Sequence, residues 1–375
     1  MRILPYLCRK PVKALTLSVM KIKAIRLNNY KKFSASPSGK AFDFYDEELE
    51  KINDITLITG QNGSGKSSLL QAIASVVGAA VLDKFRPSEL DWPGFNYRYI
   101  QVGKFPVNIE IDLTFEEEEV AAVRQFTEEL KVKYPDRNYQ IPPEKKNLTI
   151  YLDYDNDRVL ATKSSGKDAF FLTKGFQYAK ILETSDKSHG RRFDQIGQIL
   201  WYDEQRTYSS IKTEGDIKLQ LKEIKELIAR WYYTHLDFQN NRFSLREGQF
   251  DKYQKLKQLY EKIFPGRTLR GATLSKGGGN DMDIVFNDGR NDYDFSELSA
   301  GERAVFPILL DFANKRINNS IILIDELELH LHPPLQQQFL NALPHLGQNN
   351  QFIISTHSPI IAAQFPDYKK IVMES

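Results

Sequence analysis

The chain has 375 residues, 41% of them hydrophobic and 12% aromatic, so it can bury a sizeable core and is long enough for about two domains. Its 51 Lys and Arg residues nearly balance its 49 Asp and Glu residues, so no global charge favours nucleic acid or an anionic membrane, although a local basic groove stays open. The single cysteine, Cys8, excludes an internal disulfide and favours a reducing, cytoplasmic compartment.

The N-terminal 19 residues do not share the strand pattern that follows them. They carry several basic side chains before an apolar piece that is too short and broken for a secretory signal. We interpret residues 1–19 as a loose N-terminal extension, or as the result of a start codon assigned to Met1 instead of Met20. No stretch of the chain approaches the roughly 18 to 20 apolar residues of a membrane span, so we expect no membrane segment.

The first half of the chain alternates between strand patterns and helices. A strand pattern begins at Met20, and the apolar run DITLITG (residues 54–60) predicts a second strand that leads into a Gly-rich turn and a helix. VNIEIDLTF (residues 107–115) predicts a third strand, followed by a helix whose acidic first turn and basic last turn suit the helix dipole. The pattern then predicts a hairpin over residues 147–162 and a buried strand that runs into a loop over residues 199–206.

The second half contains helices and then a strand–helix–strand unit. Residues 216–264 have a charged, helical pattern without a sustained heptad, so we expect helices and no long coiled coil. A Gly-rich loop and a strand turning at Asn287-Asp288-Gly289 follow. The runs IILIDE (residues 321–326) and QFIISTHS (residues 351–358) predict buried strands with a helix between them, which indicates a parallel sheet with crossovers.

A Gly-rich turn between the second strand and its helix matches the GxxxxGK[ST] phosphate loop. Its glycines let successive N–H groups point at a β-phosphate, Lys66 bridges the β- and γ-phosphates, and the Ser67 hydroxyl ligates Mg²⁺. An ordinary Gly-rich turn is the alternative, but the placement between strand and helix favours ATP. The predicted nucleotide-binding residues of this loop are Gly60, Gln61, Asn62, Gly63, Ser64, Gly65, Lys66, Ser67 and Ser68.

Two further strand ends carry side chains suited to phosphate chemistry. Asp325 ends a predicted central strand, where open α/β sheets place ligands, and would hold Mg²⁺. Glu326 would polarise the attacking water, and His357, at the end of the next strand, would contact the γ-phosphate. The alternatives are structural carboxylates and a partly buried, satisfied histidine. We predict Glu326, His357 and Lys66 as the catalytic residues.

The segment FSELSAGERAVFPILL (residues 295–310) places a small polar turn at the start of an apolar helix. The N–H groups at such a start form a seat for an anion. We expect this seat to be free, because the turn lies far from the phosphate loop in sequence. The predicted ligands of a phosphate group here are Ser299, Gly301 and Glu302.

Together these motifs resemble the ABC-type ATPases of the RecF, SMC and OLD branch, and in particular small bacterial ATPases with DELELHLHP and QFIISTHSP near the C-terminus. The resemblance covers residues 20–375. It implies an α/β P-loop NTPase fold of the ABC-ATPase type, with a mixed sheet core, an antiparallel β subdomain and a helical insertion. It also implies that LSAGE is the signature motif, so that Ser299 binds the ATP held by Lys66 of another subunit in a homodimer.

The resemblance also implies boundaries. We expect a lobe with the phosphate loop and the β subdomain over residues 20–210. A helical insertion would span residues 211–270. A C-terminal lobe with the signature, the Asp-Glu strand and the switch histidine would span residues 271–375.

Weaker motifs complete the resemblance. Gln205, followed by Arg206, is the candidate Mg²⁺-sensing glutamine, with Gln101 as its rival. The stretch Asn29-Tyr30-Lys31-Lys32-Phe33 resembles a strand end near the nucleotide base, and an ordinary basic strand surface explains it equally well. The histidines of ELHLHP (residues 328–333) do not form a closed four-ligand set, so we expect no zinc there.

Departures from the family narrow the function. Leu327 replaces a usual proline, short helices replace long coiled coils, and the chain ends soon after STHSP, without room for the nuclease domain of OLD proteins. We expect a slow ATPase that regulates a separately encoded effector such as a nuclease, as in the Septu and PARIS types of anti-phage defence. The alternatives are a RecF-like DNA-repair ATPase that binds DNA and an ATP-dependent scaffold with negligible turnover.

Overall fold

The computed structural model describes most of the chain. The described residues are 20–34, 39–82, 86–90, 95–101, 105–186, 191–204, 221–246, 249–275 and 281–374. The expected extension over residues 1–19 and the candidate glutamine Gln205 with Arg206 lie outside them.

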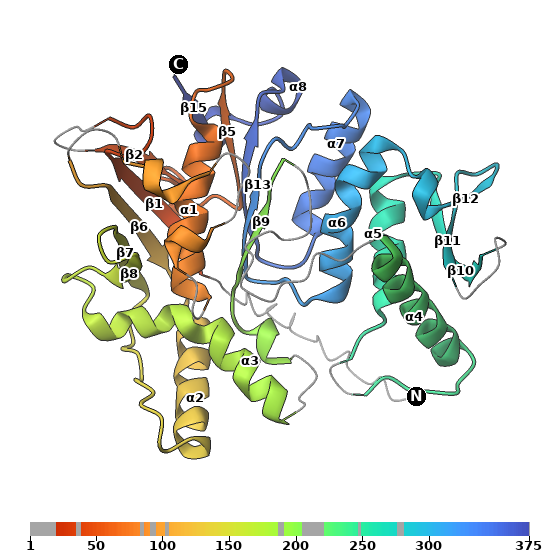
Figure 1. The fold of residues 1–375 in the computed structure, drawn as a ribbon, viewed down its shortest axis with the longest axis horizontal. Coiled ribbons are helices and arrows are strands. Elements are labelled where there is room, and N and C mark those ends of the chain that lie inside the picture. The colour runs from red at the N-terminus through yellow and green to blue at the C-terminus, as the bar shows by residue number, and fades with distance from the viewer. Residues whose placement is uncertain are drawn as a thin grey trace, which may run out of the picture.

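A five-stranded parallel sheet forms the centre of the molecule (Figure 1). Its strands, in spatial order, are β15 (Lys370–Met373), β5 (Ile55–Gly60), β14 (Gln351–Thr356), β13 (Ile321–Ile324) and β9 (Ile199–Tyr202). In β13, Ile321 and Leu323 face one hydrophobic cluster, whereas Ile322 and Ile324 face another. Both faces of the sheet are therefore covered, which explains why these strands are continuous apolar runs.

An antiparallel sheet and one helix cover the first face. The sheet has the order β2 (Lys40–Asp43), β1 (Lys21–Asn28), β6 (Asn108–Thr114), β7 (Asn147–Asp153) and β8 (Arg158–Ala161). Helix α1 (Lys66–Val81) lies between this sheet and the parallel sheet, so nearly all of its residues are buried. The predicted hairpin over residues 147–162 is β7 and β8, and the strands predicted around residues 54–60 and 107–115 are also confirmed.

Helices and a small sheet cover the second face. Helices α6 (Ala300–Asn314) and α7 (Pro333–Ala342) pack beside α5 (Lys252–Ile263), which in turn contacts α4 (Leu221–Gln239). A three-stranded antiparallel sheet of β10 (Thr268–Leu274), β11 (Met282–Asn287) and β12 (Asp292–Asp294) lies against α4 and α5. We call α5 together with these three strands the insertion block.

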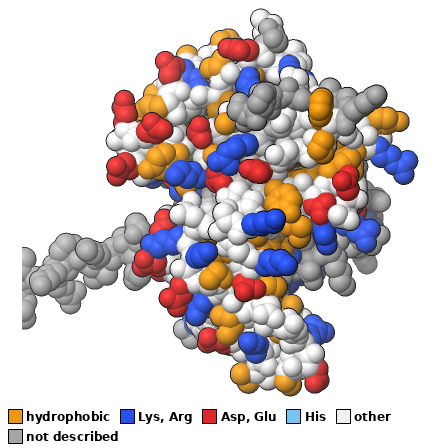
Figure 2. Space-filling view, turned by 90° about the vertical axis from the view of Figure 1, so that its left-hand side faces the viewer, with side chains coloured by type: hydrophobic (Ala, Val, Ile, Leu, Met, Phe, Trp, Pro, Cys, Tyr) orange, Lys and Arg blue, Asp and Glu red, His pale blue; other side chains and the backbone are white. Residues whose placement is uncertain are grey.

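The remaining elements are small or peripheral. Helices α2 (Glu117–Lys133) and α3 (Gly175–Asp186) pack together around a third, smaller hydrophobic cluster. The short elements are β3 (Tyr45–Asp46), β4 (Lys51–Ile52) and α8 (Pro359–Ala362). Figure 2 shows the face that carries the antiparallel sheet, where Lys and Arg side chains are interspersed with acidic and hydrophobic ones. None of the helices in the described ranges is long and apolar enough to cross a membrane.

The α/β architecture with an antiparallel β subdomain and a helical insertion is confirmed, but details differ from the sequence prediction. The sequence pattern predicts a break between two helices over residues 235–248, whereas α4 continues through His235 to Gln239. Residues 272–274 are the last residues of β10, and the predicted Gly-rich loop around residues 277–279 lies outside the described residues. The sequence patterns did not identify β2, β3, β4, α3 or β15.

A buried carboxyl group ties α2 to the rest of the protein. Glu119 is 3% exposed, and its Oε1 accepts a hydrogen bond from the backbone N–H of Gly197 at 2.9 Å. Burial raises the pKa of Glu119 from an ordinary value of 4.5 to about 8, despite that hydrogen bond. The folded protein therefore binds a proton at neutral pH that the unfolded chain releases, and its stability falls as the pH rises from about 5 to about 8.

We predict that Glu119→Gln, which keeps the shape of the protonated side chain, removes this loss. Between pH 5 and pH 8, the free energy of unfolding of the wild type should fall by on the order of 3 kcal/mol more than that of the variant. Urea unfolding at both pH values measures the difference. Glu128→Gln, on an exposed position of the same helix, is the control and should track the wild type. A constant difference between Glu119→Gln and the wild type would contradict the pKa assignment.

Candidate nucleotide site

The predicted phosphate loop connects β5 to the N-terminus of α1, where helical N–H groups favour an anion. Its backbone requires glycine at two positions. A Cβ atom on Gly65, which has a φ of 100°, would lie 2.7 Å from Cδ of Lys32. A Cβ atom on Gly60 would lie 2.6 Å from the carbonyl oxygen of Met373 in β15. The glycines of the motif thus allow both the turn and its close packing.

The polar groups of the loop fit a nucleotide phosphate. Lys66 is 6% exposed, and its Nζ donates hydrogen bonds to the carbonyl oxygens of Gly60 and Gln61, each at 2.9 Å. The Oγ of Ser64 is buried without a hydrogen-bond partner, which is costly unless a ligand supplies one. Lys32 donates to the carbonyl oxygen of Gly63 at 2.6 Å. The loop therefore holds one buried ammonium group and one unsatisfied hydroxyl in a turn built for phosphate.

The stretch Asn29–Phe33 lies against this loop, which favours its interpretation as part of the nucleotide site. Besides the Lys32 contact, the Nζ of Lys31 contacts Oε1 of Gln71 on α1 and lies 4.9 Å from the ring centre of Phe95. Burial lowers the pKa of Lys31 to about 8. The sequence motif alone had left this stretch undecided between a ligand contact and a strand surface.

The two predicted acidic residues follow β13 and share one hydroxyl group. Ser355 Oγ, on β14, donates to Oδ1 of Asp325 and accepts a hydrogen bond from the backbone N–H of Glu326 at 2.8 Å. Burial raises the pKa of Asp325, while hydrogen bonds from Ser355 and Ser67 and the charge of Lys66 oppose that rise. A buried carboxylate in contact with the Ser67 hydroxyl fits an Mg²⁺ ion as the sequence predicted.

Glu326 has the backbone and the electrostatics of a functional residue. Its φ of 46° lies in the left-handed region, which costs a non-glycine residue free energy. Burial is the largest effect that raises the pKa of Glu326. The charge of Asp325 raises this pKa further, and His357 opposes the rise. A carboxylate with a raised pKa accepts a proton more readily, as a general base must.

His357 is held by a carboxylate that sequence reasoning did not assign to the site. Oε1 of Glu328 accepts a hydrogen bond from the backbone N–H of His357 at 2.6 Å and lies 2.9 Å from its ring Nδ1. Oε2 of Glu328 accepts from Thr356 Oγ1 at 2.7 Å. The side chain of His357 is 45% exposed, so its ring is fixed at one nitrogen and accessible at the other. The only sequence signal was a second glutamate two residues after Glu326.

Ser299 and Glu302 of the signature turn already hydrogen-bond each other, whereas the sequence predicted a free anion seat. Ser299 caps α6, and both its N–H and its hydroxyl donate to Oε2 of Glu302, at 2.9 and 2.7 Å. The N–H of Glu302 donates in return to Ser299 Oγ at 3.3 Å. This is the reciprocal capping box of Ser-x-x-Glu sequences. Gly301 packs close to α7, since a Cβ atom at this position would lie 2.8 Å from Cδ2 of Leu335 and would require that side chain to shift.

The structure brings the phosphate loop, Asp325, Glu326 and His357 to one edge of the parallel sheet, because they follow the carboxyl ends of neighbouring strands. Ser299 is exposed on a different element, and no hydrogen bond within the described ranges joins its turn to the loop. Gln101 donates its side-chain amide to the carbonyl oxygen of Phe105 at 2.6 Å.

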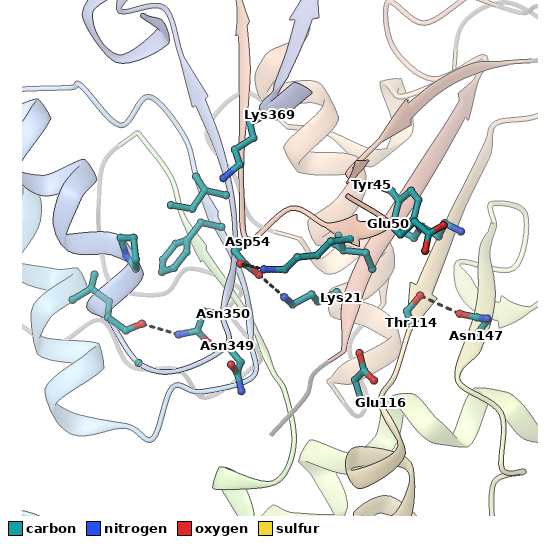
Figure 3. Close-up of a pocket in the computed structure, with 18 residues that line it drawn as sticks. Lys21, Tyr45, Glu50, Asp54, Thr114, Glu116, Asn147, Asn349, Asn350 and Lys369 are labelled. Carbon is teal, nitrogen blue, oxygen red and sulfur yellow. Dashed lines mark hydrogen bonds and ion pairs between the residues drawn. The ribbon is translucent and has the colours of Figure 1, made fainter. Parts of the chain in front are cut away.

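A cleft lies at the opposite edge of the parallel sheet. Figure 3 shows this cleft of about 680 Å³, which the amino ends of β5 and β14 help to line. Lys21 and Lys51 both donate to the carboxylate of Asp54, at 2.6 and 2.8 Å. These two ammonium groups are already paired with a carboxylate, so the cleft is a less favourable site for a phosphate group than the loop is.

A protein family and a retron ATPase match most of this chain, and a further relative matches a shorter part. The family described as "AAA domain, putative AbiEii toxin, Type IV TA system" matches residues 55–363. The Retron Vc95 probable ATPase of Vibrio cholerae serotype O1 biovar El Tor is 27% identical over 91% of this chain and 71% of that protein. The Septu protein PtuA of Bacillus thuringiensis is 32% identical over 21% of this chain and 23% of that protein.

Solved structures add a weaker likeness. The SmcHead bound to the C-winged helix domain of ScpA matches 91% of each chain with 17% identity and a TM-score of 0.49. The family match and the strand order, with a phosphate loop between β5 and α1, agree with an α/β P-loop NTPase fold. The chain belongs to the AAA-domain family whose description is given above.

Proposed function

We propose that the protein is an ATPase that closes as a homodimer around ATP and regulates a separately encoded effector, such as a nuclease, in the cytoplasm during bacterial anti-phage defence. One observation carries the enzymatic part of this proposal. The buried ammonium group of Lys66 follows the carboxyl end of β5, and the carboxylates of Asp325 and Glu326 follow the carboxyl end of β13, on the other side of β14 in the same parallel sheet. ATP chemistry needs a phosphate-binding cation, a metal ligand and a base in this arrangement.

Each residue then has a role in the proposed site. The backbone N–H groups of the loop and Lys66 bind the phosphates, and Ser67 and Asp325 would hold Mg²⁺, which neutralises phosphate charge when bound. The resemblance adds Gln205 to these ligands. Glu326 accepts the proton of the attacking water, and its raised pKa supports that role.

His357 would contact the γ-phosphate through the ring nitrogen that Glu328 does not hold. The ring Nδ1 lies 2.9 Å from a carboxylate oxygen of Glu328, which orients the ring and leaves Nε2 to face outward. The exposure of the side chain supports a contact with a ligand at the surface of the sheet edge.

The dimer rests on the position of the signature turn. Ser299 and Ala300 are exposed, and so are Gln61, Asn62 and Gly63 of the loop, so both halves of a composite site are accessible to a second subunit. Ser299, Gly301 and Glu302 belong to a helix start without a hydrogen bond to the loop of the same chain, which supports binding in trans.

The proposed role in anti-phage defence rests on related proteins. The names of the retron and Septu proteins support a defence role, and the resemblance to Septu and PARIS ATPases supplies the separately encoded nuclease. DNA binding and a scaffold with negligible turnover are the competing outcomes, which turnover measurements with and without DNA distinguish.

Lys66→Ala should abolish ATP binding, because it removes the charge that bridges the phosphates. His357→Ala should bind ATP as the wild type does but turn it over more slowly. Calorimetry with a non-hydrolysable ATP analogue measures the first property, and phosphate release measures the second. Lys51→Ala, in the distant cleft, is the matched control and should leave both unchanged. Equal loss of affinity in the Lys66 and His357 variants would refute their separate roles.

Glu326→Gln should retain ATP binding and lose hydrolysis by about 10²- to 10⁴-fold, because an amide cannot accept the proton while Asp325 still binds Mg²⁺. The variant should accumulate as a closed dimer in ATP, which size-exclusion chromatography with light scattering detects. Glu128→Gln serves as the control for a lost surface charge. Wild-type turnover in Glu326→Gln would show that another residue is the base.

Mixing two inactive variants tests whether Ser299 acts in trans. Ser299→Arg should block closure of the dimer sterically, and Lys66→Ala should abolish ATP binding by the phosphate loop. Each variant alone should therefore be inactive. A heterodimer pairs the intact Lys66 of one chain with the intact Ser299 of the other, so activity should return in part. If both sites must fill for closure, the ATP affinity of the Ser299→Arg monomer decides: unchanged affinity supports action in trans, and weakened affinity supports action within one chain.

A further inference from the structure

The carboxylate of Glu302 is the most heavily hydrogen-bonded acidic group near the signature turn. Oε2 accepts hydrogen bonds from the N–H and hydroxyl of Ser299 and forms an ion pair with Nη1 of Arg267. Oε1 accepts hydrogen bonds from the hydroxyls of Tyr293, at 2.9 Å, and Tyr260. The carboxylate is almost fully buried. It therefore joins the turn to α5, to the residue that precedes β10 and to β12.

Glu302 is ionised at every physiological pH. Burial alone would raise its pKa, but hydrogen bonds from Arg267, Ser299 and Tyr260 overcome that effect and lower the pKa to about 2. The signature turn thus contains a fixed negative charge within hydrogen-bond distance of the two donor groups of Ser299.

A fixed negative charge at this place opposes the anion that the turn is proposed to bind. Two like charges about 4 Å apart near a protein surface weaken binding by roughly a thousandfold when nothing neutralises them. Arg267 is the cation in contact with Glu302, and its side chain is 38% exposed. The hydrogen bond that Arg267 donates to Glu302 raises the pKa of Arg267 above its ordinary value, so the guanidinium stays charged.

We propose that Arg267 is a positioning residue that allows the signature turn to accept a γ-phosphate, because it neutralises Glu302 and holds it against Tyr260 and Tyr293. The inference rests on the proposed ATP-bound dimer and deepens it. It assigns the neutralising charge to the insertion block, outside the motifs of the nucleotide site. Glu302 then acts as a neutralised support for Ser299, and the phosphate would bind at the start of α6 without an opposing net charge.

The test is ATP-dependent dimerisation in a Glu326→Gln background, measured by analytical ultracentrifugation across protein concentrations. Arg267→Gln should raise the dimer dissociation constant at least about tenfold, because it leaves the charge of Glu302 beside the phosphate. Arg270→Gln is the matched control, since Arg270 lies on β10, three residues after Arg267, and pairs with an exposed aspartate at 3.5 Å. It should change the constant less than twofold. ATP affinity of the monomers should be the same in all variants.

Adding Glu302→Gln separates charge from packing. The double variant Arg267→Gln/Glu302→Gln has neither charge and should recover most of the lost dimer affinity. Glu302→Gln alone should dimerise at least as tightly as its parent. If thermal unfolding shows that Arg267→Gln does not fold, the dimer dissociation constant of Glu302→Gln tests the proposal in its place.

Three outcomes overturn the inference. They are equal dimerisation by the Arg267 and Arg270 variants, no recovery in the double variant, and weaker dimerisation by Glu302→Gln alone. A Glu326→Gln parent that stays monomeric in ATP overturns the proposed dimer and this inference with it. A parent that dimerises while the Arg267 variant behaves like the control overturns only the inference.

Discussion

The candidate site depends on the parallel register of β5, β14 and β13. Thr59 pairs with Thr356, and Ile354 pairs with Ile324, so three chain segments leave the sheet at the same level. The Ser355 hydroxyl then connects two of them, since it donates to Asp325 and accepts from the N–H of the next residue. That second hydrogen bond supports a backbone with positive φ, which a glutamate would not adopt without compensation. A slip in register would separate Asp325 from the phosphate loop.

Acidic residues of similar chemistry are set apart by their surroundings. Burial and a neighbouring charge raise the pKa of Glu326, which leaves it ready to accept a proton. Hydrogen bonds and an arginine lower the pKa of Glu302, which keeps it ionised and unsuited to proton transfer. Glu328 accepts three hydrogen bonds or contacts from two residues and serves to orient a histidine. The roles proposed for these carboxylates follow from their donors and burial, because the side chains themselves are identical.

The sequence predicted those parts of the fold and site whose chemistry needs contiguous residues. The phosphate loop and the acidic strand end are such parts, since a turn or a strand end places every group within a few positions. Arg267 and Glu302 were not paired because they are distant in sequence, and only the fold brings them together. Short elements such as β15 (Lys370–Met373) lack enough residues for a periodic pattern. The Ser299–Glu302 contact was readable as a Ser-x-x-Glu capping box, and the expectation of a free seat overlooked that signal.

The signature helix is confined on two sides, which links the two halves of the proposed composite site. Gly301 approaches Leu335 of α7 so closely that a Cβ atom there would require the Leu335 side chain to shift. α7 follows the segment that contains Asp325 and Glu326, and α5 of the insertion block packs against both α6 and α7. Because packed elements of this kind shift together and not by continuous deformation, a displacement of α5 would move the signature turn and the acidic segment at once. In the proposed ATP-bound dimer, a contact on the insertion block would therefore affect the signature turn and the segment with Asp325 and Glu326 through the same helices.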